Sequence, residues 1–173
     1  MHNIFLTGEK NVGKSTIIKK ILQSLSSSVG GYSTEFIMKN NLKYFYLTSL
    51  SHKSNKSLMA IGDPSIKKII KIYKYAFNVF GASLILDSIN TKDVIILDEI
   101  GFIENNCNEF KDSIIKALDS EKIIIGVLKD FNGDFINCIK NRKDVTLFNV
   151  NEVNREEIPE IIMDMIKDKE CRI

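Results

Sequence analysis

The stretch of sequence that decides the fold begins at the eighth residue. It reads Gly8-Glu9-Lys10-Asn11-Val12-Gly13-Lys14-Ser15-Thr16. Its first eight residues match the Walker A pattern G-x-x-x-x-G-K-[ST] at every position, and that pattern joins a strand to a helix through a glycine-rich turn. The flanking residues supply this setting, because the apolar run Asn3–Thr7 predicts a strand and Ser15–Leu25 has the apolar spacing of a helix. The segment is therefore expected to form a phosphate-binding loop between a strand and a helix.

The residue types in this loop fit the chemistry of phosphate binding. Main-chain N–H groups of such a loop point at phosphate oxygens, and the positive end of the helix dipole favours the same negative charge. Lys14 is long enough to reach the terminal phosphates, and the Ser15 hydroxyl is a ligand for Mg²⁺. Nucleotide contacts are expected from all of residues 8–16.

A second segment is expected to bring carboxylates to the loop. The apolar run Val94–Leu97 predicts a buried strand, and Asp98 and Glu99 follow it directly, as in a Walker B segment. Ligands of parallel α/β sheets bind beyond the carboxyl ends of the strands. Asp98 is therefore expected to hold Mg²⁺ together with Ser15. Glu99 is expected to act as the general base that activates a water for attack on the γ-phosphate.

The rest of the chain predicts an α/β fold. Further strands are expected at Ile123–Val127 and Val145–Val150, with helices at about Asn108–Leu118, Phe131–Ile139 and Ile158–Ile166. Continuously apolar strands separated by helices are typical of a parallel sheet that is covered on both faces. The expected fold is a three-layer α/β domain with a mainly parallel sheet, and residues 1–173 are expected to form a single domain.

Residues 32–80 are expected to add two features to this plan. The extended stretches Tyr32–Met38 and Leu42–Leu50 flank Asn40-Asn41 and predict a β-hairpin inserted after the first helix, whereas Ser51–Ser57 predicts a loop. Beyond it, apolar residues recur at helical spacing and predict a helix over residues 66–77. These residues are Ile66, Ile69, Ile70, Tyr73 and Phe77, and Phe80 continues the spacing. Four lysines lie between these positions: Lys67, Lys68, Lys71 and Lys74. A solvated face is the favoured interpretation of these lysines, and contact with phosphate or nucleic acid is the alternative.

Composition and charge narrow the class of protein. The chain is 44% hydrophobic and 27% charged, as in an ordinary globular protein. Its 24 basic and 22 acidic side chains leave a net charge of +2, which favours neither a nucleic-acid nor a membrane partner. The three cysteines form no C-x-x-C pair, and the sequence shows neither a signal peptide nor an apolar run of membrane length. These features predict a cytoplasmic protein with reduced thiols, monomeric or weakly associated.

One competing interpretation of the second segment is a GTPase. Residues 98–101 also satisfy D-x-x-G, a GTPase switch pattern. A GTPase would also carry N-K-x-D after a later strand, but residues 141–144 read Asn-Arg-Lys-Asp and precede their strand. The glutamate next to Asp98 instead favours a hydrolase whose base adjoins the metal ligand.

With these motifs in place, the sequence resembles the THEP-type nucleoside-triphosphatase family. The similar blocks are the phosphate loop, Gly31-Tyr32-Ser33-Thr34-Glu35, residues 98–101 with Glu104, residues 141–145 and 148–150, and Asn154-Arg155. The resemblance implies a RecA-like P-loop fold and Mg²⁺-dependent hydrolysis of ATP, GTP and other nucleoside triphosphates to diphosphate and phosphate. It also implies that Thr34 and Glu35 reach the nucleotide or the attacking water. Glu104 either orients Glu99 or is an ordinary exposed acid.

The sequence departs from the family in two places. Lys10 and Asn11 stand where the family usually has Gly or Pro, and Lys74 stands where it tends to have Arg. If that arginine contacts phosphate, a lysine supplies a point charge in place of a two-pronged fork.

Positive charge for the transition state is expected from arginine. Arg142 and Arg155 are the candidates, and a surface ion pair is the alternative interpretation for each of them. Two other functions fit the same loop. One is a nucleotide or small-molecule kinase, against which the absence of any arginine before residue 142 counts. The other is an ATP-switched binding module that docks its partner on the helix expected at 66–77.

Overall fold

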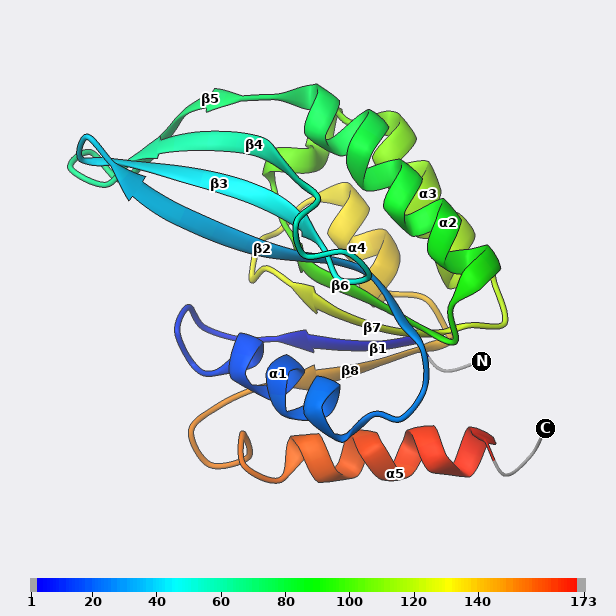
Figure 1. Ribbon diagram of the computed structural model, residues 1–173. Helices are drawn as coiled ribbons and strands as arrows, with labels where there is room; N and C mark the ends of the chain where they lie inside the picture. Colours follow the sequence, from blue (N-terminus) through cyan, green and yellow to red (C-terminus); the bar gives the residue numbers. More distant parts are fainter. Residues whose placement is uncertain (1–2, 171–173) are drawn as a thin grey trace.

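The computed structural model describes residues 3–170, apart from the side chains at positions 104, 105, 169 and 170. Over this range eight strands form one sheet in the order β5-β4-β3-β2-β6-β7-β1-β8 (Figure 1). Its parallel part is made of β2 (Val29–Lys39), β6 (Val94–Ile100), β7 (Ile123–Leu128), β1 (Asn3–Thr7) and β8 (Val145–Asn149). Its antiparallel part continues from β2 through β3 (Leu42–Ser49), β4 (Lys56–Asp63) and β5 (Lys68–Ile72).

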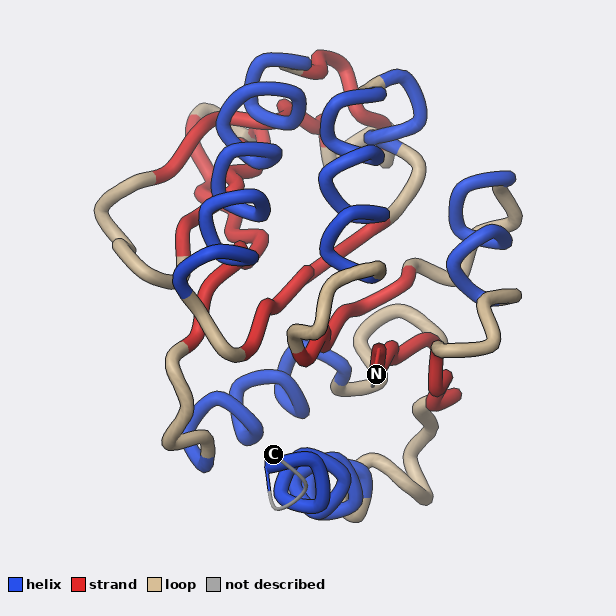
Figure 2. Tube along the Cα trace, turned by 90° about the vertical axis from the view of Figure 1, so that its right-hand side faces the viewer, coloured by secondary structure: helices blue, strands red, loops and turns tan. Residues whose placement is uncertain are grey.

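Helices cover both faces of the parallel part, as Figure 2 shows. They are α1 (Lys14–Ser24), α2 (Ala82–Thr91), α3 (Asn108–Leu118), α4 (Asp134–Lys140) and α5 (Ile158–Glu170). Two short turns complete the set, the π-helical η1 (Ala76–Gly81) and the 3₁₀ turn η2 (Ile103–Asn106).

Alternate residues of β6 show how the sheet divides the core into two layers. Ile95 and Leu97 pack into a cluster with α2, α3 and α4, whereas Val94 and Ile96 pack with α1 and α5. All four side chains are fully buried, which fits the period of two that a strand imposes. The prediction of a three-layer α/β fold with a mainly parallel sheet is confirmed.

The hairpin predicted after the first helix is present. Asn40 and Asn41 have φ values of 50° and 59°, the left-handed conformation that a two-residue turn of this type needs. The hairpin is, however, the first half of a four-stranded antiparallel extension, β2–β5, that continues the central sheet instead of standing apart from it.

The prediction of a helix over residues 66–77 is wrong. Residues 68–72 form β5, and helical structure begins only at Lys74. The cause is an irregularity in the pairing of β4 with β5, where Gly62 pairs with Ile69 but Ile61 pairs with Lys71. One extra residue, Ile70, interrupts the alternation of the strand, so its apolar residues acquire helical spacing. In addition, β4 begins at Lys56, inside the stretch that was expected to be a loop.

Helix α2 is an element that the sequence analysis did not predict. It follows directly on η1, whose wider π-helical turn changes the phase of the apolar positions before α2 begins. Ile85 is nevertheless fully buried against the sheet, and Ser88 donates a hydrogen bond of 2.6 Å to the Leu84 carbonyl within the helix.

Candidate active site

The loop at residues 8–13 has a backbone that requires glycine at both ends. Gly8 and Gly13 have φ values of 133° and 117°, a region that side chains with a Cβ rarely adopt. A Cβ at Gly8 would also collide with the Val150 carbonyl, which follows β8. The two glycines of the motif therefore shape the turn and let the loop between β8 and α5 approach it closely.

Lys14 lies within this loop. Its Nζ donates hydrogen bonds to the carbonyl oxygens of Gly8, at 2.7 Å, and Glu9, at 2.6 Å. Burial lowers the pKa of Lys14, and the charges of Glu99, Asp130 and Asp98 oppose that shift while Lys129 adds to it. These four side chains act on the ammonium group from the ends of β6 and β7, so the loop and the two strands meet at one place.

Asp98 lies near the end of β6 and is only 9% exposed. Burial, together with the neighbouring charge of Glu99, raises its pKa to about 6, although Lys19 and Lys14 act in the opposite direction. Its main-chain carbonyl accepts a hydrogen bond of 2.7 Å from the Thr34 hydroxyl on the adjacent strand β2. Thr34 therefore fixes the backbone next to Asp98, which gives the similarity at residues 31–35 a structural basis.

Glu99 forms an ion pair with a residue that sequence reasoning missed. The Lys129 Nζ lies 3.2 Å from the Glu99 carboxylate and 5.2 Å from the centre of the Phe102 ring. Lys129 is the first residue after β7, and its N–H donates a hydrogen bond of 2.8 Å to the Ile100 carbonyl. The rule that ligands bind at carboxyl ends of strands points to this position, once β7 is known to lie between β6 and β1.

The oxygen ligands needed for Mg²⁺ are available at this edge. Ser15 and Lys19 are four residues apart on one face of α1, and the charge of Lys19 lowers the pKa of Asp98. Among the side chains that the structure describes, no three His, Cys, Asp or Glu residues converge as a metal cluster. The Ser15 hydroxyl and the Asp98 carboxylate fit Mg²⁺, which binds through few protein ligands and completes its shell with water and substrate phosphates.

Open space lies on two sides of the loop. A cavity of about 530 Å³ is lined by residues 8–12 of the loop, by Asp130 and by residues 149–152. This volume is in the range of small-molecule sites. A smaller hollow of about 100 Å³ is lined by Gly13, Thr16, Ile17, Lys20, Arg155 and Glu156. Residues 8–16 thus border both spaces.

Arg155 is held beside the loop by the segment between β8 and α5. The Asn151 carboxamide oxygen accepts hydrogen bonds from the N–H groups of Val153 and Asn154, and the Asn154 side chain donates to the Asn149 carbonyl. This arrangement brings the Arg155 Cδ within 3.5 Å of the place a Cβ would take on Gly13. The Arg155 side chain is 42% exposed, and its Nε lies 3.8 Å from the Glu156 carboxylate.

The structure does not bring Arg142, a candidate for the transition state, to the phosphate loop. Its guanidinium donates hydrogen bonds of 2.7–2.9 Å to the carboxylates of Asp144 and Asp119. Asp144 in turn contacts Asn3, at the start of β1, whereas the phosphate loop follows the end of that strand. Arg142 therefore lies at the amino edge of the sheet, and its role there is an ion-pair network.

Two further residues singled out from the sequence do not join the cluster. Glu35 is exposed on β2, and no contact of its side chain with the loop or with Asp98 is seen among the described residues. The side chain of Glu104 lies outside the described part of the chain.

Among the described residues, no helix is both long and apolar enough to cross a membrane.

Comparisons with known proteins place this site among related chains. A family model described as NTPase matches residues 3–163. Nucleoside-triphosphatase THEP1 of Thermotoga sp. (strain RQ2) is 32% identical over 167 residues, which cover 95% of each chain. The cancer-related nucleoside-triphosphatase of Homo sapiens is 29% identical over 179 residues, covering 92% of this chain and 94% of the human protein.

Two solved structures share the fold. The crystal structure of THEP1 from Aquifex aeolicus superposes with a TM-score of 0.76 at 21% identity and covers 95% of this chain and 98% of its own. The solution structure of a human cancer-related nucleoside triphosphatase gives a TM-score of 0.75 at 25% identity, with coverages of 97% and 98%.

Proposed function

The chain belongs to the NTPase family and is a nucleoside-triphosphatase, a hydrolase, and we propose that its carboxyl-edge site cleaves the terminal phosphate of nucleoside triphosphates in the presence of Mg²⁺. One observation carries this proposal. Main-chain carbonyl oxygens of the loop and charged side chains from the ends of β6 and β7 all act on the ammonium group of Lys14. Phosphoryl transfer depends mainly on such positioned charge, because the transition state carries its negative charge on oxygens.

Binding of the triphosphate is the task of residues 8–16. The N–H groups of the loop and of the first turn of α1 are placed to hold phosphate oxygens at the positive end of the helix dipole. Lys14 is the cation for the terminal phosphate, and it would exchange its carbonyl contacts with Gly8 and Glu9 for phosphate oxygens. The adjoining cavity of about 530 Å³ supplies room for the rest of the nucleotide.

Ser15 and Asp98 are the residues that would hold Mg²⁺. When bound there, the ion supplies positive charge to the phosphate oxygens. The raised pKa of Asp98 fits this role, since a buried carboxylate is stabilised in its charged form by a cation beside it.

Glu99 is the proposed general base. Its carboxylate takes a proton from water while the water oxygen forms a bond to the γ-phosphorus and the bond to the bridging oxygen breaks. The products are the nucleoside diphosphate and inorganic phosphate. Lys129 is a positioning residue in this scheme, because its ion pair with Glu99 fixes the carboxylate at the end of β6. Arg155, next to Gly13, adds positive charge on the far side of the loop.

The direct test is phosphate release from ATP, GTP, CTP and UTP, with Mg²⁺ titrated and with excess EDTA. We expect release that depends on Mg²⁺ and that is unchanged when nucleoside monophosphates are added as acceptors. Undiminished release in EDTA would contradict the metal assignment. Transfer of the phosphate to an added monophosphate, in place of release to water, would identify the chain as a kinase.

A further inference from the structure

The β2–β5 extension carries far more positive charge than the balance of the whole chain suggests. Residues 35–75 contain eight of the 24 basic side chains but only two of the 22 acidic ones, so this segment has a net charge of +6 and the remainder −4. The near-neutral net charge of the whole chain conceals this separation. A concentrated positive surface attracts a polyanion regardless of the net charge elsewhere.

The strand register gathers part of this charge on one face, which we call the open face. Across it Ile37 pairs with Tyr44, Tyr44 with Ile61, and Ile61 with Lys71. The open face consists of Ile37, Lys39, Leu42, Tyr44, Tyr46, Lys56, Leu58, Ile61, Lys68 and Lys71, with the acids Glu35 and Asp63.

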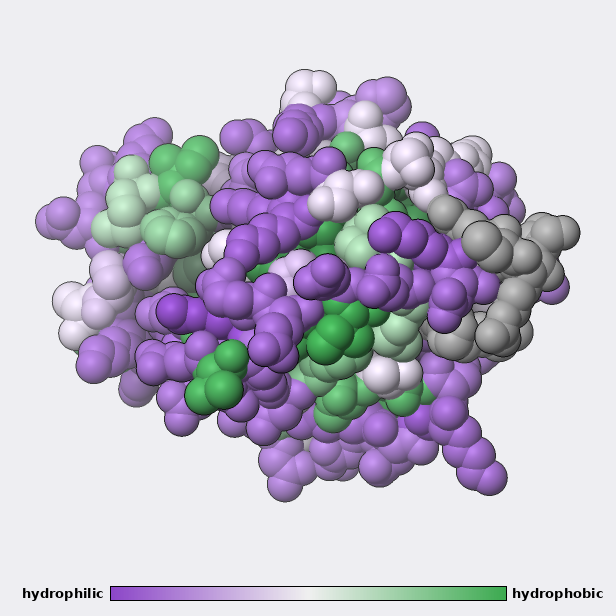
Figure 3. All heavy atoms as spheres, turned by 90° about the horizontal axis from the view of Figure 1, so that it is seen from below, coloured by the Kyte–Doolittle hydropathy of each residue, from purple (hydrophilic) through white to green (hydrophobic). Residues whose placement is uncertain are grey.

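The open face continues the side of the sheet on which α1 and α5 lie. Gly31 of β2 pairs with Ile96, which belongs to the core cluster of those helices, and alternation along β2 carries the same side to Ile37. The outer parts of β2–β5 project beyond the helices in Figure 1. Viewed from the side of α5, apolar side chains gather among hydrophilic ones at the end of the molecule to which β2 and β3 project (Figure 3).

Two lysines of the open face contact tyrosine rings. The Lys56 Nζ lies 5.1 Å from the centre of the Tyr46 ring, and the Lys71 Nζ lies 4.8 Å from the ring of Tyr73, at the end of β5. Lys39, Lys56, Lys68 and Lys71 are exposed, and none of them forms an ion pair with a carboxylate of the described residues. Asp63 instead accepts hydrogen bonds from Ser65.

The open face also lies near the candidate active site. β2 pairs with β6 only over residues 29–32, so its remaining length runs past the carboxyl end of the central sheet. That is the edge at which the phosphate loop and Asp98 lie. An occupant of the open face would therefore lie at the same edge of the sheet as the phosphate loop.

We propose that the open face binds single-stranded nucleic acid. Single-stranded nucleic acid binds to surfaces on which aromatic rings lie next to cations, because its bases stack on the rings while lysines neutralise its phosphates. A duplex keeps its bases stacked inside and would leave the tyrosines without partners. An acidic peptide would pair with the lysines but would gain nothing from Tyr44 and Tyr46.

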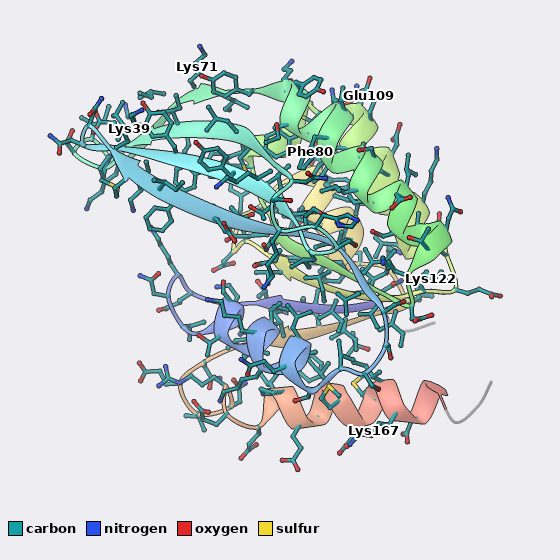
Figure 4. All side chains as sticks on the ribbon, in the orientation of Figure 1. Lys39, Lys71, Phe80, Glu109, Lys122 and Lys167 are labelled. Atoms are coloured by element: carbon teal, nitrogen blue, oxygen red, sulfur yellow. The ribbon has the colours of Figure 1, made fainter. Side chains whose placement is uncertain are left out.

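The test uses the full chain and fluorescein-labelled oligo(dT) and oligo(U) of about 15 nucleotides, a length that spans such a surface. Fluorescence anisotropy is measured over a range of KCl concentrations. The first variant is Lys56→Ala/Lys68→Ala/Lys71→Ala. Its matched control is Lys116→Ala/Lys143→Ala/Lys167→Ala, which removes the same number of positive charges from other parts of the chain. Figure 4 shows Lys39 and Lys71 on the extension and Lys167 on α5, at the opposite side of the molecule.

We expect the open-face triple variant to bind at least tenfold more weakly than the parent and its salt slope to fall by about two, because each phosphate contact on a single strand contributes roughly 0.7. The control should remain within about twofold of the parent. Tyr46→Ala should weaken binding roughly fivefold or more, with Tyr46→Phe retaining most of it, because stacking needs the ring and not the hydroxyl. Far-UV circular dichroism and thermal unfolding report that each variant is folded.

The proposal is overturned if the parent shows no anisotropy change up to about 100 μM protein, the weak end of nonspecific binding. Equal losses in the two triple variants would also overturn it, as would equal affinity for a duplex of the same length. Unchanged binding by Tyr46→Ala would mean that charge alone accounts for the binding, and it would contradict the proposal that bases stack on this surface. All these outcomes are independent of whether the chain hydrolyses triphosphates.

Discussion

The amino and carboxyl edges of the central sheet both carry clustered charges, but the two clusters are built differently. At the amino edge, Arg142 forms hydrogen bonds of 2.7 Å to Asp119 and to Asp144, and Asn3 adds a further bond of 3.0 Å to Asp144. At the carboxyl edge, the Lys14 ammonium group donates hydrogen bonds only to main-chain carbonyls among the described residues, and the Asp98 carboxylate is buried.

The two aspartates show the difference most clearly. Hydrogen bonds from Arg142 hold the pKa of Asp144 below its usual value, whereas burial raises the pKa of Asp98 to about 6. The first carboxylate is stabilised by the folded protein itself. The second is destabilised by it and gains most from a ligand cation. We propose that the amino edge serves the fold and the carboxyl edge serves the reaction.

Glu99→Gln should have the largest effect on the rate. Glutamine has nearly the same size and still accepts a hydrogen bond from water, but it cannot take the proton, so single-turnover hydrolysis should slow by about 10²- to 10⁴-fold. Nucleotide affinity by calorimetry should change by less than about tenfold. Normal turnover would remove Glu99 as the base, and loss of binding would make it a ground-state contact.

Arg155→Ala should come next, because this side chain lies at the phosphate loop but is partly exposed. We expect the rate to fall by about 10- to 100-fold, less than the effect of a fully inserted arginine finger, with a smaller loss of affinity. The measurement is the single-turnover rate beside the dissociation constant. Equal losses in both would show that Arg155 binds substrate and transition state alike.

Lys129→Met should reduce kcat by about tenfold, because Glu99 loses the ion pair that positions it. KM should change little, and Lys129→Arg should restore most of the activity by replacing the cation. Lys122→Met, which removes a lysine before β7 at the opposite end of that strand, is the control. A rise in KM with an unchanged kcat would mean that Lys129 binds substrate and does not position Glu99.

The smallest effect belongs to the amino edge and appears as stability. Asp144→Asn should lower the free energy of unfolding at pH 7 by about 1–3 kcal/mol, through the weakened charged hydrogen bonds. The pKa of Asp144 is lowered in the folded state, so its contribution is present above the pKa of the unfolded chain and is lost as pH falls through the folded value. Urea unfolding at pH 7 and near pH 3 should therefore show the difference between variant and parent shrinking in acid. A difference that grows in acid would contradict the assignment.

The carboxyl edge was largely predictable from the sequence, because its parts are local. A strand, a glycine turn and a helix stand in one segment, and Asp98 follows its own strand directly. Asn40-Asn41 likewise specifies its turn through two residues that accept positive φ.

What could not be predicted depends on the order of the strands. Lys129 becomes part of the site because β7 lies between β6 and β1, and no local pattern contains that fact. Arg142 precedes its strand and so falls at the amino edge, although the same family signature includes Arg155 at the other edge. Strand β5 was missed because an irregular pairing with β4 gave its residues the spacing of a helix.

The most direct test of the division between the two edges measures Lys14→Ala and Arg142→Ala in the same two assays, urea unfolding without nucleotide and single-turnover hydrolysis of ATP. Lys14→Ala should slow hydrolysis by about 10³-fold and change the free energy of unfolding by less than about 1 kcal/mol. Arg142→Ala should lower that free energy by about 2–4 kcal/mol, because it removes the charged hydrogen bonds to Asp119 and Asp144, and should slow hydrolysis less than about threefold. Opposite results, or equal losses of rate and stability in both variants, would contradict the account.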